Sequence, residues 1–344
     1  MFVGIYLIMV YDPQILFNDG FYDLIEVRIP EGSILKPKYP AALSCRTHAL
    51  GRIFDVFGGT LSKTAPQYWP AAGWGSSPHL MYSGYDKKGE WFQLYQIGFG
   101  GVPGRPVGDG MDGHSMWPAF TNIPNEYLES YFPLRIERYE TLVDSGGAGY
   151  HRGGNGIDIA YRFLEPGEIS CHDDRWLTYN WGINGGKVGQ RSTKFIIRAD
   201  GTKKIIPSKC DNIKVNEGDI LHYITWGGGG WGDPLTREPE RVAKDAERGL
   251  VSIEKALRDY GVTVDPETYA VDAEATEKKR LELRQQWGDI KVYDFGPPLS
   301  EILAKCLEET GLEPPKPPVF SRTTGNPNEL KMVIDAVAAS PDDE

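Results

Sequence analysis

The 344-residue sequence lacks cysteine motifs, an excess of basic residues and any long apolar run. Its four cysteines (Cys45, Cys171, Cys210 and Cys306) lie far apart and form no Cys-x-x-Cys pair. We therefore expect reduced, mostly buried thiols of a cytoplasmic protein, and no structural zinc site made from them. The net charge of −11 argues against a nucleic-acid partner, because phosphate binding needs clustered lysine and arginine.

The most apolar stretch, residues 1–11, is too short to span a bilayer, so we expect no membrane segment. It also lacks the basic start and the small-residue cleavage site of a signal peptide. We expect a buried helix or strand that packs against a later part of the chain or against a partner.

Glycine is abundant, with 41 residues, but the phosphate-binding glycine motifs are missing. Residues 132–140 alternate between apolar and charged side chains, which predicts a strand. Residues 146–156 are dense in glycine, which indicates positive φ angles or close approach of another backbone. No Lys-Ser or Lys-Thr follows, and residues 157–164 alternate again where a dinucleotide-binding motif would begin a helix. We predict a strand, a tight glycine connection and a second strand, in preference to a phosphate cradle.

The remaining pattern predicts an α+β protein with a β-rich core of short, mostly antiparallel strands and a mainly helical C-terminal tail. We place the β-rich domain at residues 1–235, the helical region at 236–310 and a Pro-rich, poorly ordered tail at 311–344. Helical spacing of apolar residues predicts helices at 47–61, 125–131, 239–259 and 272–287. Further strands are predicted at 21–29, 91–97, 169–172, 193–198, 204–207 and 220–225.

Two acids and a histidine lie within six residues in the segment from Asp109 to His114. Loops with such residues often carry sites, so we predict Asp112 and His114 as catalytic residues, and Asp109 and Asn122 as substrate contacts. The alternative is a tight turn in which the aspartates cap backbone amides. No third ligand stands nearby, so we predict no metal site in this chain.

A second polar cluster, Cys171-His-Asp-Asp-Arg-Trp176, does not predict a Cys-His dyad. Neighbouring residues on a strand point to opposite faces, so the Cys171 and His172 side chains cannot meet there. We expect residues 173–175 to form a local ion-pair and turn network.

Four motifs together are specific, and they resemble the hydantoinase B/oxoprolinase family. They are Asn18-Asp-Gly-Phe-Tyr22, Phe132-Pro-Leu-Arg-Ile-Glu-Arg-Tyr139, the glycine-rich segment Asp144–Gly156, and Gly227-Gly-Gly-Gly-Trp-Gly-Asp-Pro234. They follow the family's order from residue 1 to about residue 260. The resemblance implies an ATP-dependent enzyme in which an A-type part handles ATP and phosphorylates a substrate, and a B-type part completes the reaction.

The chain resembles the C-terminal half of a B-type subunit, because the family's Asn-Asp-Pro-Tyr and His-His-Ala-Asp motifs do not occur in it. The resemblance implies that this chain itself holds no cofactor. ATP and Mg²⁺ belong to the A-type partner, and a divalent metal to the N-terminal half of the B-type subunit. The expected partners are those two polypeptides and a small-molecule substrate.

The resemblance leaves the reaction open. Members hydrolyse cyclic amides (hydantoins, 5-oxoproline or lactams) or carboxylate ketones such as acetone and acetophenone. A non-catalytic scaffold subunit is a third interpretation.

The apolar start yields a testable prediction. Each buried apolar side chain contributes roughly 1.5–3 kcal/mol, so leaving residues 2–10 in water forgoes a large stabilisation. We expect the chain expressed alone to be poorly soluble or to form non-native oligomers, as judged by size-exclusion chromatography. Co-expression with the N-terminal B-type polypeptide should rescue it, and deletion of residues 1–11 should abolish the rescue. A monodisperse, stable monomer of the chain alone would contradict the interpretation as half of a divided domain.

Overall fold

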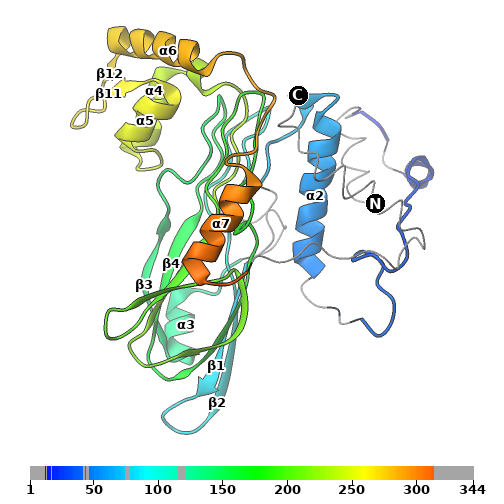
Figure 1. Cartoon of the computed structure of the whole chain (residues 1–344), viewed down its shortest axis with the longest axis vertical. Helices are drawn as coiled ribbons and strands as arrows, with labels where there is room; N and C mark the ends of the chain where they lie inside the picture. The colour runs from blue at the N-terminus through cyan, green and yellow to red at the C-terminus, as the bar shows by residue number, and fades with distance from the viewer. Residues whose placement is uncertain are drawn as a thin grey trace. The chain divides into compact units, whose positions relative to one another are not determined.

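A computed structural model describes residues 12, 14–16, 18–41, 43, 46–73, 78–114 and 121–313 (Figure 1). The chain divides into two compact units, residues 1–49 with 313–344, and residues 50–312. The apolar start and the Pro-rich tail from residue 314 lie outside the described residues, so the expectations about them stay predictions. The domain boundaries after residues 235 and 310 also stay predictions.

The first unit contains η1 (Asp19–Leu24), a short 3-10 helix. The Asn18 side chain accepts a hydrogen bond from the Gly20 amide at 3.1 Å and so caps this helix. The strand predicted at residues 21–29 is therefore wrong. Its first residues are helical, and residues 25–29 pair with no strand in the described part of the chain. The predicted helix at 47–61 is confirmed by α2 (Arg46–Ser62).

The second unit contains two large antiparallel sheets and two small two-stranded ones in its described residues. The small sheets pair β11 (Thr263–Val264) with β12 (Val271–Asp272) and β13 (Tyr293–Asp294) with β6 (Gly182–Ile183). The four-stranded sheet has the order β2 (Trp91–Ile97), β1 (His79–Tyr85), β5 (Gly167–His172) and β9 (Lys209–Val215). The five-stranded sheet has the order β3 (Leu134–Thr141), β4 (Ile157–Phe163), β10 (Ile220–Ile224), β7 (Thr193–Ile197) and β8 (Lys203–Ile206).

Both large sheets contribute to one hydrophobic core. Alternate side chains of each strand point inward, as the period of two requires. Leu80, Tyr82 and Ile169 enter this core from the four-stranded sheet, and Ile159 and Leu221 enter it from the five-stranded sheet. The short helix α3 (Asn125–Tyr131) has the predicted bounds and adds its buried Leu128.

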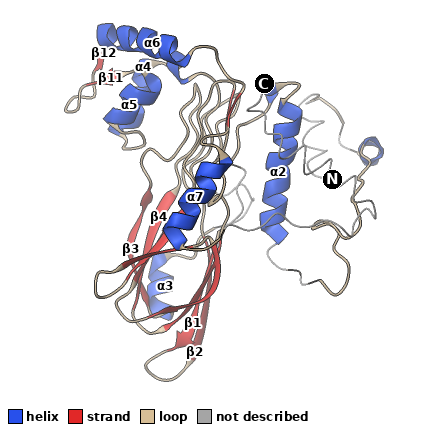
Figure 2. Cartoon of the chain, viewed as in Figure 1, coloured by secondary structure: helices blue, strands red, loops and turns tan. Residues whose placement is uncertain are grey.

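Glycine-rich segments continue from the sheets as extended chain, drawn in tan in Figure 2 between the strands and α4–α6. They are residues 98–104, 108–113, 145–156, 182–189 and 226–232, and we call them the glycine bundle. Backbone hydrogen bonds join them: Gly101 N to Trp226 O at 2.8 Å, Gly154 N to Val102 O at 2.8 Å, Gly228 N to Gly154 O at 2.9 Å and Gly230 N to Lys187 O at 2.9 Å.

Several glycine positions of the bundle have no room for a side chain, because neighbouring backbones touch there. A Cβ on Gly154 would lie 1.9 Å from the Met111 carbonyl oxygen, and one on Gly153 would lie 1.9 Å from that of Gly228. Real Cβ atoms do not approach a heavy atom that closely, so only glycine fits. The close-approach interpretation of the glycines is confirmed.

The predicted strand–glycine–strand order is also confirmed, because β3 and β4 pair in antiparallel register. The connection between them is not tight, since residues 142–156 run through the glycine bundle. Amides that a phosphate would need are already bonded within the protein, including those of Gly146, Gly147, Gly153 and Gly154.

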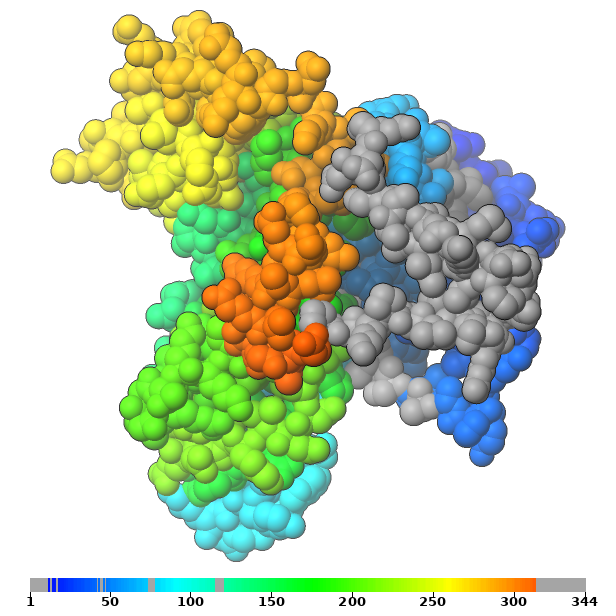
Figure 3. All heavy atoms as spheres, in the orientation of Figure 1, coloured from blue at the N-terminus to red at the C-terminus, as the bar shows by residue number. Residues whose placement is uncertain are grey.

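The C-terminal part of the second unit is mainly helical, which together with the antiparallel sheets confirms the α+β prediction. It contains α4 (Pro239–Glu247), α5 (Ile253–Tyr260), β11 (Thr263–Val264), β12 (Val271–Asp272) and α6 (Ala273–Trp287). Figure 3 shows α4–α6, in yellow to gold, at the opposite end of this unit from the β1–β2 hairpin in cyan.

The single helix predicted at residues 239–259 is wrong, because the chain breaks between α4 and α5. Gly249 has a φ of +67°, and Ser252 Oγ accepts a hydrogen bond from the Lys255 amide at 3.0 Å. A left-handed glycine ends the first helix and a serine cap begins the second.

The remaining elements are short or peripheral. They are η2 (Pro66–Tyr68), β6 (Gly182–Ile183), η3 (Pro234–Thr236), β13 (Tyr293–Asp294), which pairs with β6, and α7 (Leu299–Thr310). Across the described ranges, no helix combines the length and apolar character needed to cross a membrane.

The glycine bundle predicts a large difference between two Gly→Ala substitutions. Gly154→Ala places a methyl group against the Met111 carbonyl and should destabilise the fold by about 3 kcal/mol or more. Gly58→Ala, within α2, meets nothing within 4 Å and should be neutral or stabilising by up to about 1 kcal/mol. Chemical denaturation of both variants measures the difference. Equal stability of the two variants would contradict close backbone packing in the bundle.

Candidate functional site

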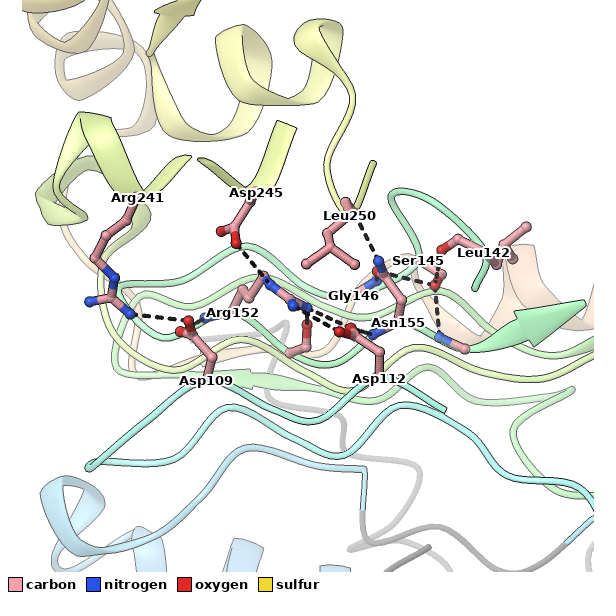
Figure 4. Close-up of polar contacts among 12 residues, drawn as sticks. Asp109, Asp112, Leu142, Ser145, Gly146, Arg152, Asn155, Arg241, Asp245 and Leu250 are labelled. Atoms are coloured by element: carbon pink, nitrogen blue, oxygen red, sulfur yellow. Dashed lines mark hydrogen bonds and ion pairs between the residues drawn. The ribbon is translucent and has the colours of Figure 1, made fainter. Parts of the chain in front are cut away.

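The segment from Asp109 to His114, which we call the site loop, belongs largely to the glycine bundle and lies along residues 145–156. The Gly110 amide donates to the Arg152 carbonyl at 2.7 Å, and the Gly113 amide donates to the Asn155 carbonyl at 2.8 Å. These bonds hold Asp109 and Asp112 beside the same segment, as Figure 4 shows.

Asp112 binds the Arg152 side chain through both carboxylate oxygens. The distances are 2.7 Å from Nη1 to Oδ1 and 2.9 Å from Nη2 to Oδ2. Oδ1 also accepts the Asn155 amide at 2.7 Å. Arg152 is 6% exposed. Its burial favours the neutral form, but the Asp112 carboxylate outweighs this effect and raises the pKa of Arg152.

Asp109 forms a bidentate ion pair with a second arginine, Arg237. Arg237 Nη1 and Nη2 lie 2.7 and 2.9 Å from its oxygens, and Arg241 Nη2 lies 3.0 Å away. The Asp109 carboxylate also accepts the Arg152 amide at 3.0 Å. Burial acts to raise the pKa of Asp109, but the hydrogen bonds and positive charge of the arginines lower it to about 2.

Asp245 of α4 connects the two pairs. Its Oδ2 accepts from Arg237 Nη2 at 2.7 Å, and its Oδ1 lies 3.6 Å from Arg152 Nε. We call Asp109, Asp112, Arg152, Arg237, Arg241 and Asp245 the Arg–Asp cluster. It joins the site loop, the 145–156 segment and α4 with balanced charge.

A second set of hydrogen bonds continues the same contact toward α5. Asn155 Oδ1 accepts the Gly146 amide at 2.8 Å, and its Nδ2 donates to the Leu250 carbonyl at 2.8 Å. Asp144, which has a φ of +69°, accepts the Ser252 amide at 2.7 Å. The Asp144 and Asn155 side chains therefore hold the turn between α4 and α5 in place, and Figure 4 shows the contact of Asn155 with Leu250.

The structure brings Asp109 and Asp112 together through Arg152, but it does not bring the other two predicted site residues to them. The His114 side chain is exposed, and its backbone amide donates to the Gly100 carbonyl at 3.0 Å. Asn122 Nδ2 donates to the Tyr139 hydroxyl of β3. No contact within the described residues joins His114 or Asn122 to the Arg–Asp cluster, and their predicted roles stay predictions.

The hydrogen bonds of the cluster anchor the loop: Asp112 accepts two at Oδ1 and one at Oδ2. The catalytic role of Asp112 and the substrate contact of Asp109 stay predictions. No group of three or more His, Cys, Asp or Glu side chains able to hold a metal gathers in the part of the chain that the structure describes. Each carboxylate also accepts a backbone amide, Asp109 that of Arg152 and Asp112 that of Asn155. This agrees with the alternative interpretation, in which the aspartates cap backbone amides.

Sequence reasoning missed Arg152, Arg237 and Asp245. Arg152 stands inside the glycine-rich motif, where a lone long cation between glycines is a signal of a buried partner. Arg237 and Asp245 gave no such signal, because charged residues on a helical stretch normally face solvent.

The sheets, the bundle and the helices define an α+β fold, and comparisons with known proteins identify its family. The chain belongs to the hydantoinase B/oxoprolinase family, whose sequence model matches residues 1–234. It is 32% identical over 266 residues to the B-type subunit of a putative D-/L-hydantoinase from a Pseudomonas species, a match that covers 76% of this chain and 44% of that protein.

Two solved structures are similar in fold. The ATP-dependent caprolactamase from Pseudomonas jessenii has a TM-score of 0.68 at 25% identity, over 81% of this chain and 50% of its own. Acetone carboxylase in its nucleotide-free form has a TM-score of 0.65 at 21% identity, over 89% of this chain and 46% of its own. The chain spans about half the length of the curated relatives that it matches.

The Arg–Asp cluster predicts a loss of stability for Asp109→Asn. The change leaves Arg237, 1% exposed, with fewer negative partners, and should lower the free energy of unfolding at pH 7 by about 3 kcal/mol. The control is Glu247→Gln, which removes only an exposed pair with Lys244 at 4.0 Å and should cost less than about 1 kcal/mol.

Asp109→Asn also tests how the free energy of unfolding depends on pH. The pKa of Asp109 is lower in the folded chain (about 2) than its usual value of about 3.9. Its contribution is therefore complete above about pH 4 and is lost as the pH falls toward 2. Asp109→Asn should remove that part of the acid sensitivity in denaturation curves between pH 5 and 2. Unchanged stability and an unchanged acid profile would show that the cluster does not anchor the loop.

Proposed function

We propose that this chain is part of the B-type component of an ATP-dependent enzyme that hydrolyses a cyclic amide. In this proposal an A-type partner phosphorylates the substrate with ATP, and the B-type component completes ring opening. Hydantoins, 5-oxoproline and lactams are the proposed substrate class.

One observation carries the choice of hydrolysis over carboxylation. The 32% identity to a B-type hydantoinase subunit and the 25% identity to a caprolactamase both join the chain to proteins named for cyclic amides. The acetophenone carboxylase delta subunit of Aromatoleum aromaticum is 25% identical over 304 residues, which is below the 32% of the B-type hydantoinase subunit. The similarity to acetone carboxylase, at 21% identity, is a similarity of fold. Ketone carboxylation is therefore the second candidate.

The proposed part of this chain is a rigid platform with a site loop at its edge. The Arg–Asp cluster fixes the loop, so Asp112 and Asp109 act by positioning it. We propose the exposed His114 as the acid–base residue of the loop and Asn122 as a substrate contact. We place ATP and Mg²⁺ on the A-type partner and a divalent metal on the other half of the B-type component.

The test is an activity assay of the complete complex. The chain is purified together with the A-type polypeptide and the remaining B-type polypeptide, and phosphate release from ATP is measured with a panel of compounds. We expect hydantoin, 5-oxoproline or caprolactam to stimulate phosphate release and to yield the ring-opened acid. Stimulation only by acetone or acetophenone with bicarbonate would overturn hydrolysis in favour of carboxylation.

His114→Gln separates a catalytic role from a scaffold role in the same assay. Loss of a general acid–base typically lowers the rate by about 10² to 10⁴-fold. Because the His114 side chain is exposed, its replacement should leave the unfolding temperature unchanged. If the complex requires this chain but keeps full activity with His114→Gln, His114 is not the acid–base residue and the chain acts as a scaffold.

A further inference from the structure

Cys171 and Cys210 are 39 positions apart in sequence but lie directly opposite each other in the four-stranded sheet. β5 and β9 pair in antiparallel register, and Cys171 is the Cα partner of Cys210. Directly opposed residues of an antiparallel pair point to the same face. Both side chains pack on the inner face, where Cys171 belongs to the hydrophobic core and Cys210 borders it.

The spacing of such a pair suits a disulfide. Opposed Cα atoms in antiparallel strands are about 4.5 to 5.5 Å apart, and disulfides join Cα atoms about 4.4 to 6.8 Å apart. The register shifts between Ile169 and Cys171, and Asn212 of β9 has a φ of +56°. This bulge next to Cys210 leaves the backbone of β9 less constrained by ladder bonds, so it can adjust to a covalent bridge.

The two thiols differ in access and in acidity. Cys171 is fully buried, whereas Cys210 is partly exposed on β9, the strand at one end of the sheet order. The hydrogen bond from the Cys171 thiol lowers the pKa of Cys210, burial opposes this effect, and the nearby Lys194 ammonium reinforces it. The same hydrogen bond, together with burial, raises the pKa of Cys171. Cys210 is thus the more reactive thiol and Cys171 is its neighbour.

We propose that Cys171 and Cys210 form a reversible dithiol–disulfide site that peroxides oxidise. The Cys210 thiolate attacks a peroxide oxygen, breaks the O–O bond and becomes a sulfenic acid, while hydroxide leaves. The Cys171 sulfur then attacks the sulfenic sulfur, the S–O bond breaks, and the oxygen leaves as water with the Cys171 proton. In total two thiols and one hydrogen peroxide give one disulfide and two waters, so both sulfurs are oxidised and the peroxide is reduced.

The bridge would tie β9 covalently to the interior of its sheet. Cys306 provides the contrast within the same chain. It lies on the buried side of α7 and is 1% exposed, and burial raises its pKa, so it has neither the access nor the thiolate character that oxidation requires.

The test uses the full chain, purified with its partners, as a Cys45→Ser/Cys306→Ser variant that keeps only the proposed pair. Treatment with hydrogen peroxide should remove both titratable thiols and lower the mass by two hydrogen atoms. Peptide mapping should recover a fragment that links Cys171 to Cys210, and dithiothreitol should restore both thiols. Hydrogen exchange in β9 should slow on oxidation.

Two further variants assign the order of events. With Cys171→Ser added, the Cys210 sulfenic acid should persist and be trapped by dimedone. With Cys210→Ser added, Cys171 should remain a thiol under the same treatment. The proposal is overturned if both thiols of the parent variant survive peroxide, or if Cys210 goes on to sulfinic acid without a bridge. A dimedone adduct on Cys171 in the Cys210→Ser variant would overturn the assignment of Cys210 as the entry thiol.

Discussion

Direct contact between polypeptide backbones is the constraint on which the rest of the second unit depends. In most cores side chains fill the space between elements, but in the glycine bundle the space is only as wide as the chain itself. The missing Cβ atoms let each segment bond to neighbours on more than one side: Gly154, for example, donates to Val102 and accepts from Gly228. Buried backbone groups are thereby satisfied without a sheet.

A bundle held largely by backbone hydrogen bonds needs side-chain contacts to fix its position against α4. The Arg–Asp cluster supplies that fixation, because its charged pairs lie at the join between the bundle and α4. Burying such charges is costly unless every partner is present, so the cluster specifies one arrangement of loop and helix. Ala148 adds an apolar contact at the same join, since it packs in one core with Val242 and Tyr260. The site loop is consequently held both by the 145–156 segment and by α4.

Much of this fold could be predicted from the sequence, because its signals are local. Alternation over β3 and β4 and helical spacing over α2 and α6 each depend on neighbouring residues alone. The α4–α5 break was missed because apolar spacing continues across Gly249, and the cap at Ser252 decides the outcome. The strand expected at residues 21–29 failed because Asn18 caps a helical turn.

The site was less predictable, because its partners are remote in sequence. Asp109 and Asp112 were found as a cluster of acids, but their role depends on Arg237 and Arg152, which lie 128 and 40 positions away. Strand register is equally hard to predict from local sequence. The spacing of Cys171 and Cys210 in the sequence does not show that the bulged antiparallel pair β5–β9 places them opposite each other. Such contacts follow from the assembled topology.

We infer that the glycine segments form a rigid bundle from which solvent is excluded. Amide hydrogen exchange tests it directly, measured at Gly153, Gly154, Gly228 and Gly230, whose amides all donate to backbone carbonyls. We predict exchange as slow as that of the central strands β4 and β10, because it should require unfolding of the whole unit. Exchange of these glycines at the rate of an exposed turn, such as Asp200-Gly201, would contradict it.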